Sequence, residues 1–273
     1  LKTLELPKAA AEKCDLLVLL VADGFTPGAD ALSAVVAQAL KSADLTTKAG
    51  QSLSLYQAAG VAARRVLLVG VGAGDARGVR AGVQAAAALL RAPSVKRAVL
   101  CFAGAASADA VTAAVQTVAQ ATYVYTTTKS KAEARALTRC VVGVADVAAA
   151  RAEFDAGVAL VAGIELAREW GNRPANYATP TMLADAAKAL AKQPRVQCKV
   201  HGPAEVAKLG MGAFMAVAQG AADPLRLIEL RHSGAAKSQA PVVLVGKGLT
   251  FDTGRISIEP AAASDERKHD LFG

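Results

Sequence analysis

One stretch decides the fold class: residues 65–91, which read RVLLVGVGAGDARGVRAGVQAAAALLR. Its first six residues have the length of a buried strand and are apolar after Arg65, and from residue 78 onward the Ala-rich sequence has a helical pattern. A glycine-rich turn joins the two parts. The stretch therefore predicts a β-strand followed directly by a helix, which is the repeating unit of a mostly parallel α/β sheet.

The same rhythm extends on both sides of this stretch. Apolar runs predict further strands at 15–22, 98–103 and 140–144, and Ala-rich stretches predict helices at 28–42, 107–121 and 147–170. Prolines at 174 and 180 interrupt the pattern, after which we expect a helix at 181–190 and strands at 196–200, 225–231 and 242–246. We predict two α/β domains with mostly parallel sheets, at residues 1–150 and 151–273.

Composition limits the class of protein. The 273 residues are 53% hydrophobic but only 4% aromatic, and charged residues interrupt every apolar run before it reaches the length of a membrane helix. The four cysteines are far apart and form no Cys-x-x-Cys pair, which favours a soluble protein of the reducing cytoplasm. The net charge of +8 is spread along the chain, so it supports nucleic-acid binding only weakly.

The glycine-rich turn at residues 70–74 resembles the start of a dinucleotide-binding loop. Its pattern is Gly-x-Gly-x-Gly, and the third glycine of the fingerprint, three residues after the second, is missing. We therefore favour an ordinary turn, and nucleotide binding is the least favoured hypothesis. No serine occupies a Gly-x-Ser-x-Gly elbow, so a serine hydrolase is not indicated.

The segment 242–254, VVLVGKGLTFDTG, carries a buried-strand pattern straight into a lysine and an aspartate. Lys247 and Asp252 lie five residues apart, and Asp270 follows eighteen residues later. Two carboxylates and a neutral amine can bind a pair of divalent cations, since neighbouring cations lower the pKa of a lysine. From spacing alone, the favoured interpretation is a Lys247–Asp252 salt bridge with a solvated Asp270.

Three motifs resemble the leucyl aminopeptidase family, also called cytosol aminopeptidases, and look most like a bacterial member. They are GKGLTFDTG at 246–254, NRPANYATP at 172–180 and LGMGAFMAVAQG at 209–220. The resemblance is strong over 169–273 and rests only on layout in the first half. It implies a macro-domain-like N-terminal domain, a zinc-exopeptidase-like but incomplete C-terminal domain, and a homohexamer. It also implies two Mn²⁺ or Zn²⁺ ions, with Lys247, Asp252 and Asp270 at metal-ligand positions.

The sequence departs from the family pattern close to these residues. The family has Gly-Gly-Ile-Ser-Leu-Lys-Pro where this chain has Gly-Arg-Ile-Ser-Ile-Glu-Pro, so Arg255 replaces a glycine and Glu259 replaces the catalytic lysine. A carboxylate at that position would place negative charge beside the developing oxyanion. The family's later Asp-Ala-Glu-Gly-Arg motif, which supplies two more ligands, is also absent before Gly273.

The resemblance implies an aminopeptidase that releases leucine-like N-terminal residues from peptides by attack of a metal-activated water. Because of Glu259 and the missing motif, we expect this chain as given to be impaired or inactive. The alternative is a non-catalytic structural or DNA-binding regulatory relative of the family. A salt-dependent DNA titration would distinguish the regulator from the enzyme.

Overall fold

The computed structural model describes residues 2–250 and divides into two compact units that meet between Leu166 and Ala167. The division falls inside helix α6 (Arg151–Gly171), in the same region of the chain as the predicted domain boundary. That boundary, between residues 150 and 151, stays a prediction. None of the helices within residues 2–250 is long and apolar enough to cross a membrane.

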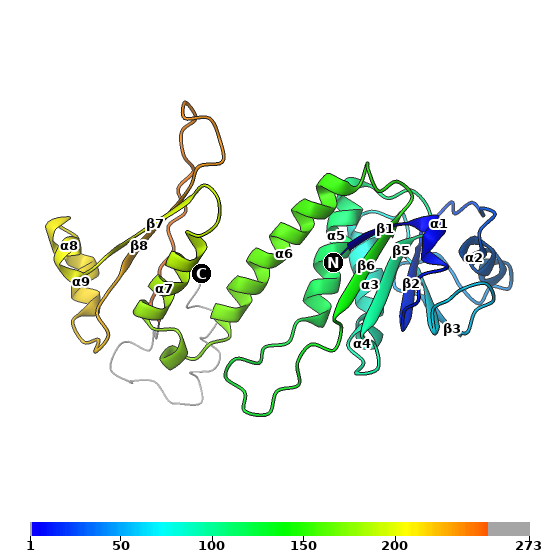
Figure 1. Ribbon diagram of the computed structural model, residues 1–273, viewed down its shortest axis with the longest axis horizontal. Helices are drawn as coiled ribbons and strands as arrows, with labels where there is room; N and C mark the ends of the chain where they lie inside the picture. Colours follow the sequence, from blue (N-terminus) through cyan, green and yellow to red (C-terminus); the bar gives the residue numbers. More distant parts are fainter. Residues whose placement is uncertain (1, 251–273) are drawn as a thin grey trace. The chain divides into compact units, whose positions relative to one another are not determined.

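A six-stranded sheet forms the centre of the first unit (Figure 1). Its strands lie in the order β1-β6-β5-β2-β4-β3, and every neighbouring pair is parallel except β3 and β4. The mostly parallel sheet predicted for the N-terminal part is confirmed. The strands are β1 (Lys2–Glu5), β2 (Leu16–Val21), β3 (Ser52–Tyr56), β4 (Arg65–Gly70), β5 (Arg97–Phe102) and β6 (Arg139–Val144).

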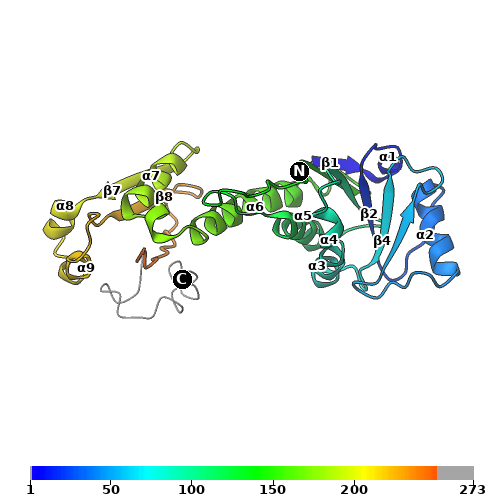
Figure 2. The same cartoon turned by 90° about the horizontal axis from the view of Figure 1, so that it is seen from below.

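Helices cover both faces of this sheet, as the two views show (Figure 2). Alternate residues of β2 explain the two layers, because Leu16, Val18 and Leu20 enter one apolar cluster and Leu17, Leu19 and Val21 enter the other. The first cluster packs against α3, α4, α5 and α6, and the second against α1 and α2. The helices are α1 (Leu6–Ala9), α2 (Ala31–Lys41), α3 (Ala76–Ala85), α4 (Ala87–Leu90) and α5 (Ala108–Thr122).

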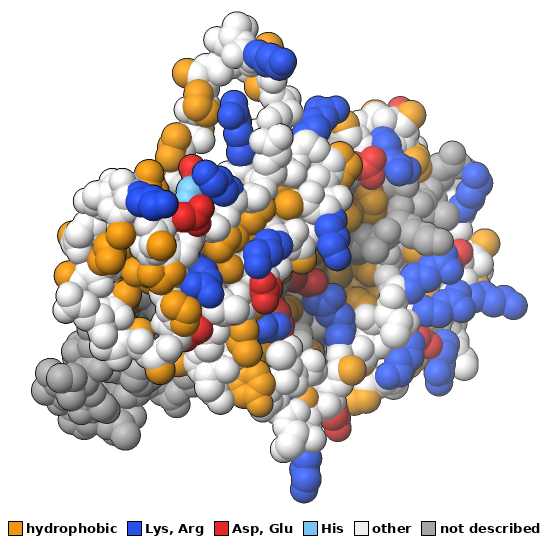
Figure 3. Space-filling model, turned by 60° about the vertical axis from the view of Figure 1, so that its left-hand side comes forward, with side chains coloured by type: hydrophobic (Ala, Val, Ile, Leu, Met, Phe, Trp, Pro, Cys, Tyr) orange, Lys and Arg blue, Asp and Glu red, His pale blue; other side chains and the backbone are white. Residues whose placement is uncertain are grey.

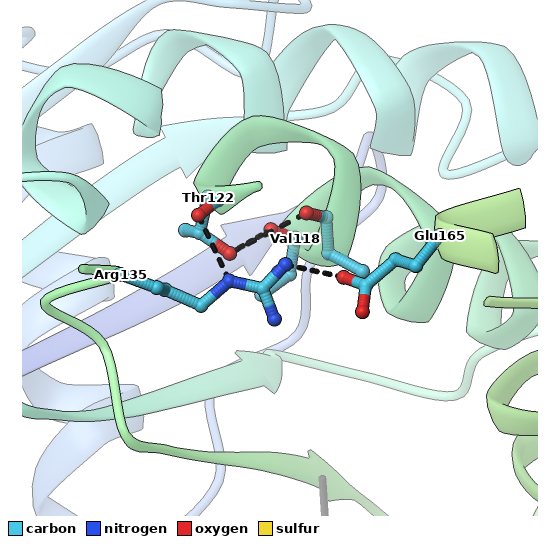
Figure 4. A network of polar contacts seen from close by, with 5 residues as sticks. Val118, Thr122, Arg135 and Glu165 are labelled. Carbon is cyan, nitrogen blue, oxygen red and sulfur yellow. Dashed lines mark hydrogen bonds and ion pairs between the residues drawn. The ribbon is translucent and has the colours of Figure 1, made fainter. Parts of the chain in front are cut away.

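A polar network anchors the charged loop between α5 and β6 (Figure 4). The Nε of Arg135 donates a hydrogen bond to the carbonyl oxygen of Thr122 at 2.9 Å, which lies at the end of α5. The guanidinium also forms an ion pair with Glu165 on α6. One arginine therefore links this loop to two helices of the first unit.

Three cysteine thiols are buried in the first unit, and the fourth, Cys198, is half-buried in the second. Burial and the nearby Glu12 carboxylate raise the pKa of Cys14 to about 11. Burial likewise raises the pKa of Cys101 and of Cys140. All four thiols are free.

The second unit contains a two-stranded sheet of β7 (Val196–His201) and β8 (Leu227–His232). The pair is antiparallel, so the prediction of a mostly parallel sheet is wrong for the described part of this unit. Both strands were expected near these positions, but the apolar pattern of a strand carries no information about its direction. The remaining elements are η1 (Ala175–Tyr177), α7 (Pro180–Leu190), α8 (Pro203–Lys208) and α9 (Gly212–Ala218).

The predicted strand at 242–246 does not form, since residues 233–250 contain neither helix nor strand. The side chains of Val242, Val243, Leu244 and Val245 are between 73% and 92% exposed. A strand needs a neighbour to accept and donate its backbone hydrogen bonds, and none of the described strands pairs with this segment. An apolar pattern alone is therefore not sufficient to predict a strand.

Candidate functional site

Lys247 is the one predicted metal ligand within residues 2–250. It follows the four exposed apolar residues of the 242–245 segment, and its own side chain is exposed. Asp252 and Asp270 lie outside the described residues, as do Glu259 and Arg255. The structure therefore does not bring the three predicted ligands together, and their shared site stays a prediction.

Within the described ranges, no group of three or more His, Cys, Asp or Glu side chains gathers where it could hold a metal ion. The chemistry of the predicted set is suitable, because carboxylate oxygens and a neutral amine nitrogen are ligands for borderline divalent ions such as Zn²⁺ and Mn²⁺.

The family-like segment 172–180 begins where α6 ends. The guanidinium of Arg173 lies 4.1 Å from the centroid of the Trp170 ring and its Nη2 lies 3.4 Å from the Glu169 carboxylate. The Nε of Arg173 is buried and has no hydrogen-bond partner in the described part of the chain. Thr179 then caps α7 by accepting a hydrogen bond from the backbone N–H of Met182 at 3.4 Å.

Asp223 holds the start of α7 from a distant part of the sequence. Its carboxylate accepts hydrogen bonds from the backbone N–H of Thr181 at 3.2 Å and from the Thr181 hydroxyl at 3.0 Å. Burial of the Asp223 carboxyl raises its pKa, but these hydrogen bonds outweigh burial and the net pKa is lowered. This contact has no local signal in the sequence, because the partners are 42 residues apart.

His201 is a second residue whose role was not apparent from the sequence. It is buried at the end of β7, and its Nε2 lies 2.8 Å from the carboxylate of Glu229 on β8. This hydrogen bond lowers the pKa of Glu229. Glu205 on α8 approaches the other ring nitrogen at 4.0 Å. The histidine therefore joins the two strands through Glu229.

The glycine-rich turn after β4 uses its backbone amides internally. The N–H of Gly72 donates to the carbonyl of Thr47 at 2.7 Å, and that of Gly74 donates to the carbonyl of Val71 at 3.1 Å. The carboxylate of Asp75 caps α3 by accepting from the N–H of Gly78 at 2.7 Å, so a negative charge already occupies the helix start. These contacts support an ordinary turn over a phosphate-binding loop.

Two family models match the chain, one in each half. The model described as the N-terminal domain of the cytosol aminopeptidase family matches residues 20–132, and the model for the catalytic domain of the same family matches residues 165–273. The second match begins two residues before the start of the second unit and includes Lys247, Asp252 and Asp270.

Relatives and solved structures give the same result. A "Probable cytosol aminopeptidase" of Verminephrobacter eiseniae is 65% identical over all 273 residues, which cover 53% of that protein. A protein of the same name from an Acidovorax species is 61% identical and is covered to 55%. This chain thus spans about half the length of these relatives.

Two solved structures have a similar fold. The bottromycin maturation enzyme BotP in complex with Mn is 26% identical, with a TM-score of 0.68 over 91% of this chain and 51% of that one. A lysine-to-glutamate mutant of tomato leucine aminopeptidase is 23% identical, with a TM-score of 0.75 over 93% of this chain and 55% of that one, and it supports the fold alone. The two adjacent domain matches and the identity across the full chain establish that this chain belongs to the cytosol aminopeptidase family.

Proposed function

We propose that the protein represented by this chain is a metal-dependent aminopeptidase that releases leucine-like N-terminal residues from peptides. The observation that carries the proposal is the catalytic-domain match over residues 165–273, which includes all three predicted metal ligands. The N-terminal match over residues 20–132 supports it, because both domains of the family then occur in one chain and in the expected order. The relatives are named as cytosol aminopeptidases, which supports action on peptides in the cytoplasm.

In this proposal Lys247, Asp252 and Asp270 bind two divalent ions, Mn²⁺ or Zn²⁺, together with ligands from a later motif. Such ions polarise a carbonyl group and lower the pKa of a bound water. Lys247 coordinates only as the neutral amine, so it must lose its proton on binding the metal, and metal affinity should increase with pH. The Mn-containing BotP structure is consistent with a family that binds manganese.

Glu259 determines how much activity we expect. The family resemblance places it where a lysine stabilises the oxyanion, and a carboxylate there repels the charge that the transition state develops. Removing one oxyanion stabiliser costs roughly 10²–10³-fold in kcat in a well-studied case, and reversing its charge should cost at least as much. We therefore expect this chain to be inactive or nearly so.

This same substitution favours a second candidate function, a non-catalytic structural or DNA-binding member of the family. Basic side chains occur across the face shown in Figure 3, with hydrophobic side chains between them. The homohexamer implied by the family resemblance is compatible with both candidates, and it is part of the proposal.

Hydrolysis of leucine p-nitroanilide tests the proposal, with Mn²⁺ or Zn²⁺ added and with a chelator as the negative control. In a chain extended to the length of its relatives, Glu259→Lys restores the family residue and should raise turnover by at least tenfold, whereas the matched charge reversal Glu133→Lys, in an exposed loop of the first unit, should leave it unchanged. Lys247→Met should abolish the metal-dependent part of any activity. If Glu259→Lys produces no turnover in a chain extended to the length of its relatives, the enzyme proposal is wrong.

The non-catalytic candidate has its own readouts. Retained oligomers without turnover would favour a structural subunit, and DNA affinity that falls steeply between about 50 and 200 mM salt would favour a regulator. Sedimentation velocity and a fluorescence-anisotropy titration with duplex DNA measure these two properties.

A further inference from the structure

A cleft of about 610 Å³ lies in the first unit, at the edge of the sheet where β2, β4 and β5 begin. Its volume is within the range of small-molecule sites. None of the predicted metal ligands lines it, and the family resemblance assigns it no role. The cleft therefore needs a separate explanation.

Most residues that line the cleft are apolar, and its charged lining residues are two arginines and one aspartate. Leu16, Ala63 and Val95 are buried at its base. Arg64 and Arg65 line it from the start of β4, while Asp15 is its one acidic lining residue. Two guanidinium groups beside an apolar floor suit an anion that has an apolar body.

Arg65 is held in place before any ligand binds. Its Nε donates a hydrogen bond to the Ser54 hydroxyl at 2.7 Å, and its guanidinium lies 4.8 Å from the centroid of the Tyr56 ring. Among the described residues, neither of its two terminal nitrogens has a hydrogen-bond partner. A fixed planar guanidinium whose two terminal nitrogens can donate matches the geometry of a carboxylate or a phosphate.

Backbone hydrogen bonds also hold the wall of the cleft beside these groups. The hairpin loop 57–64 joins β3 to β4 and is fastened to the preceding segment, because the N–H of Ala62 donates to the Ala10 carbonyl at 2.7 Å and that of Arg64 donates to the Cys14 carbonyl at 3.1 Å. Gln57, at the rim, adopts a left-handed backbone conformation with φ of 51°, which is uncommon for a residue other than glycine. A preformed wall lowers the entropic cost of binding a ligand.

Asp15 offsets only part of the positive charge of the lining, because its single carboxylate faces two guanidinium groups and also interacts electrostatically with Arg64. Its carboxylate accepts hydrogen bonds from the backbone N–H groups of Lys96 and Arg97, each at 2.9 Å, and so is engaged in joining β2 to the start of β5. Arg64 is exposed, and its side chain has no hydrogen-bond or ion-pair partner in the part of the chain that the structure describes. An incoming anion thus meets two guanidinium groups and one carboxylate, which leaves a net positive charge at the cleft.

We propose that this cleft binds a small organic anion, a carboxylate or phosphate monoester with an apolar or aromatic body, through Arg65 and Arg64. The apolar body lies on the floor near Leu16 and Val95, and the anionic group accepts hydrogen bonds from the terminal nitrogens of Arg65. The site is independent of the aminopeptidase function, so each can fail without the other.

Isothermal titration calorimetry of the full chain tests the proposal with four probes of one size. Benzoate and phenyl phosphate carry the two anionic groups, benzyl alcohol is neutral, and benzylammonium is cationic. We expect saturable binding of benzoate, phenyl phosphate or both, and at least tenfold weaker binding of the other two. The preferred anion then identifies the ligand class as carboxylate or phosphate.

Substitutions of the two arginines test whether the anion binds in the cleft. Arg65→Gln should weaken anion binding roughly tenfold or more, because a charge-assisted hydrogen bond is lost. Arg64→Gln should weaken it by a smaller factor, and the charge-matched control Arg80→Gln, on an exposed position of α3, should have no effect. Circular dichroism would detect unfolding of Arg65→Gln, and Arg64→Gln keeps the test valid because its side chain makes no hydrogen bond that the fold needs. Failure of both anions to bind, or binding that neither cleft variant weakens, would overturn the proposal.

Discussion

Gly78 in α3 offers a sharp test of how the first unit is packed. A Cβ added at this glycine would lie 1.9 Å from the carbonyl oxygen of Val71, whereas real Cβ atoms essentially never approach another atom within 3.0 Å. The obstructing atom is backbone, so it cannot rotate away. Gly78→Ala must therefore displace the start of α3 by about 1 Å relative to the end of β4.

The expected cost follows from three contributions. Overpacking of this kind costs about 1–3 kcal/mol, and disturbing the Asp75 cap, which the Gly78 N–H donates to, adds up to about 1 kcal/mol. The higher helix propensity of alanine offsets about 0.5–1 kcal/mol of this loss in stability. We therefore expect a net loss of about 1–3 kcal/mol, which corresponds to a fall in Tm of roughly 3–10 °C for a unit of this size.

Gly163→Ala in α6 is the matched control. It makes the same chemical change inside a helix, but beyond the neighbouring backbone of α6 no described atom lies within 4 Å of the added Cβ, so only the propensity gain applies. Differential scanning calorimetry of the full chain should show a lower Tm for Gly78→Ala and a Tm equal to or slightly above wild type for Gly163→Ala. If the two variants shift Tm alike, the close contact between α3 and β4 is not as described.

Three further outcomes are expected. Leu100→Ala, at a fully buried position of β5, should cost about 2–5 kcal/mol in the free energy of unfolding, measured by urea denaturation, and a cost below 1 kcal/mol would contradict its place in the core. The backbone N–H of Arg97, together with that of Lys96, donates a hydrogen bond to Asp15 and lowers the pKa of its carboxyl in the folded protein. The ionised carboxylate should therefore stabilise the fold fully above the ordinary aspartate pKa of 3.8. This stabilisation should be lost as pH falls through the lower pKa of the folded state. The stability gap between wild type and Asp15→Asn, followed by thermal melts from pH 7 to pH 2, should accordingly shrink only at the acidic end. Chelation should remove any peptidase activity of a Glu259→Lys chain, and added Mn²⁺ or Zn²⁺ should restore it; activity that survives chelation would contradict a metal mechanism.

The sequence predicted strands best where both faces of the strand are buried. The runs that became β2, β4, β5 and β6 are continuous apolar segments, which only a strand covered on both sides would use. Two edge strands were missed, since SLSLY in β3 and KTLE in β1 are short and partly polar. The stretch predicted as one helix over 78–91 forms two consecutive helices, α3 and α4, which are separated by Ala86.

The candidate site was less accessible to such reasoning. A strand pattern at 242–246 was correct in composition but formed no strand, because pairing depends on neighbours that the local sequence does not specify. Motif resemblance identified Lys247 and the family, while Asp252, Asp270 and Glu259 remain predictions outside the described residues. Contacts across long separations, such as Asp223 with Thr181, have no local signal at all.

The distribution of the four thiols provides a built-in chemical reporter of local opening. Cys14, Cys101 and Cys140 lie in the first unit, and Cys198 lies in the second. With a pKa of about 11, only about one Cys14 thiol in a thousand is ionised at pH 8, and alkylating reagents attack the thiolate. Pulsed alkylation followed by peptide mass spectrometry would therefore time the opening of each unit separately in the unmodified protein, without an introduced label.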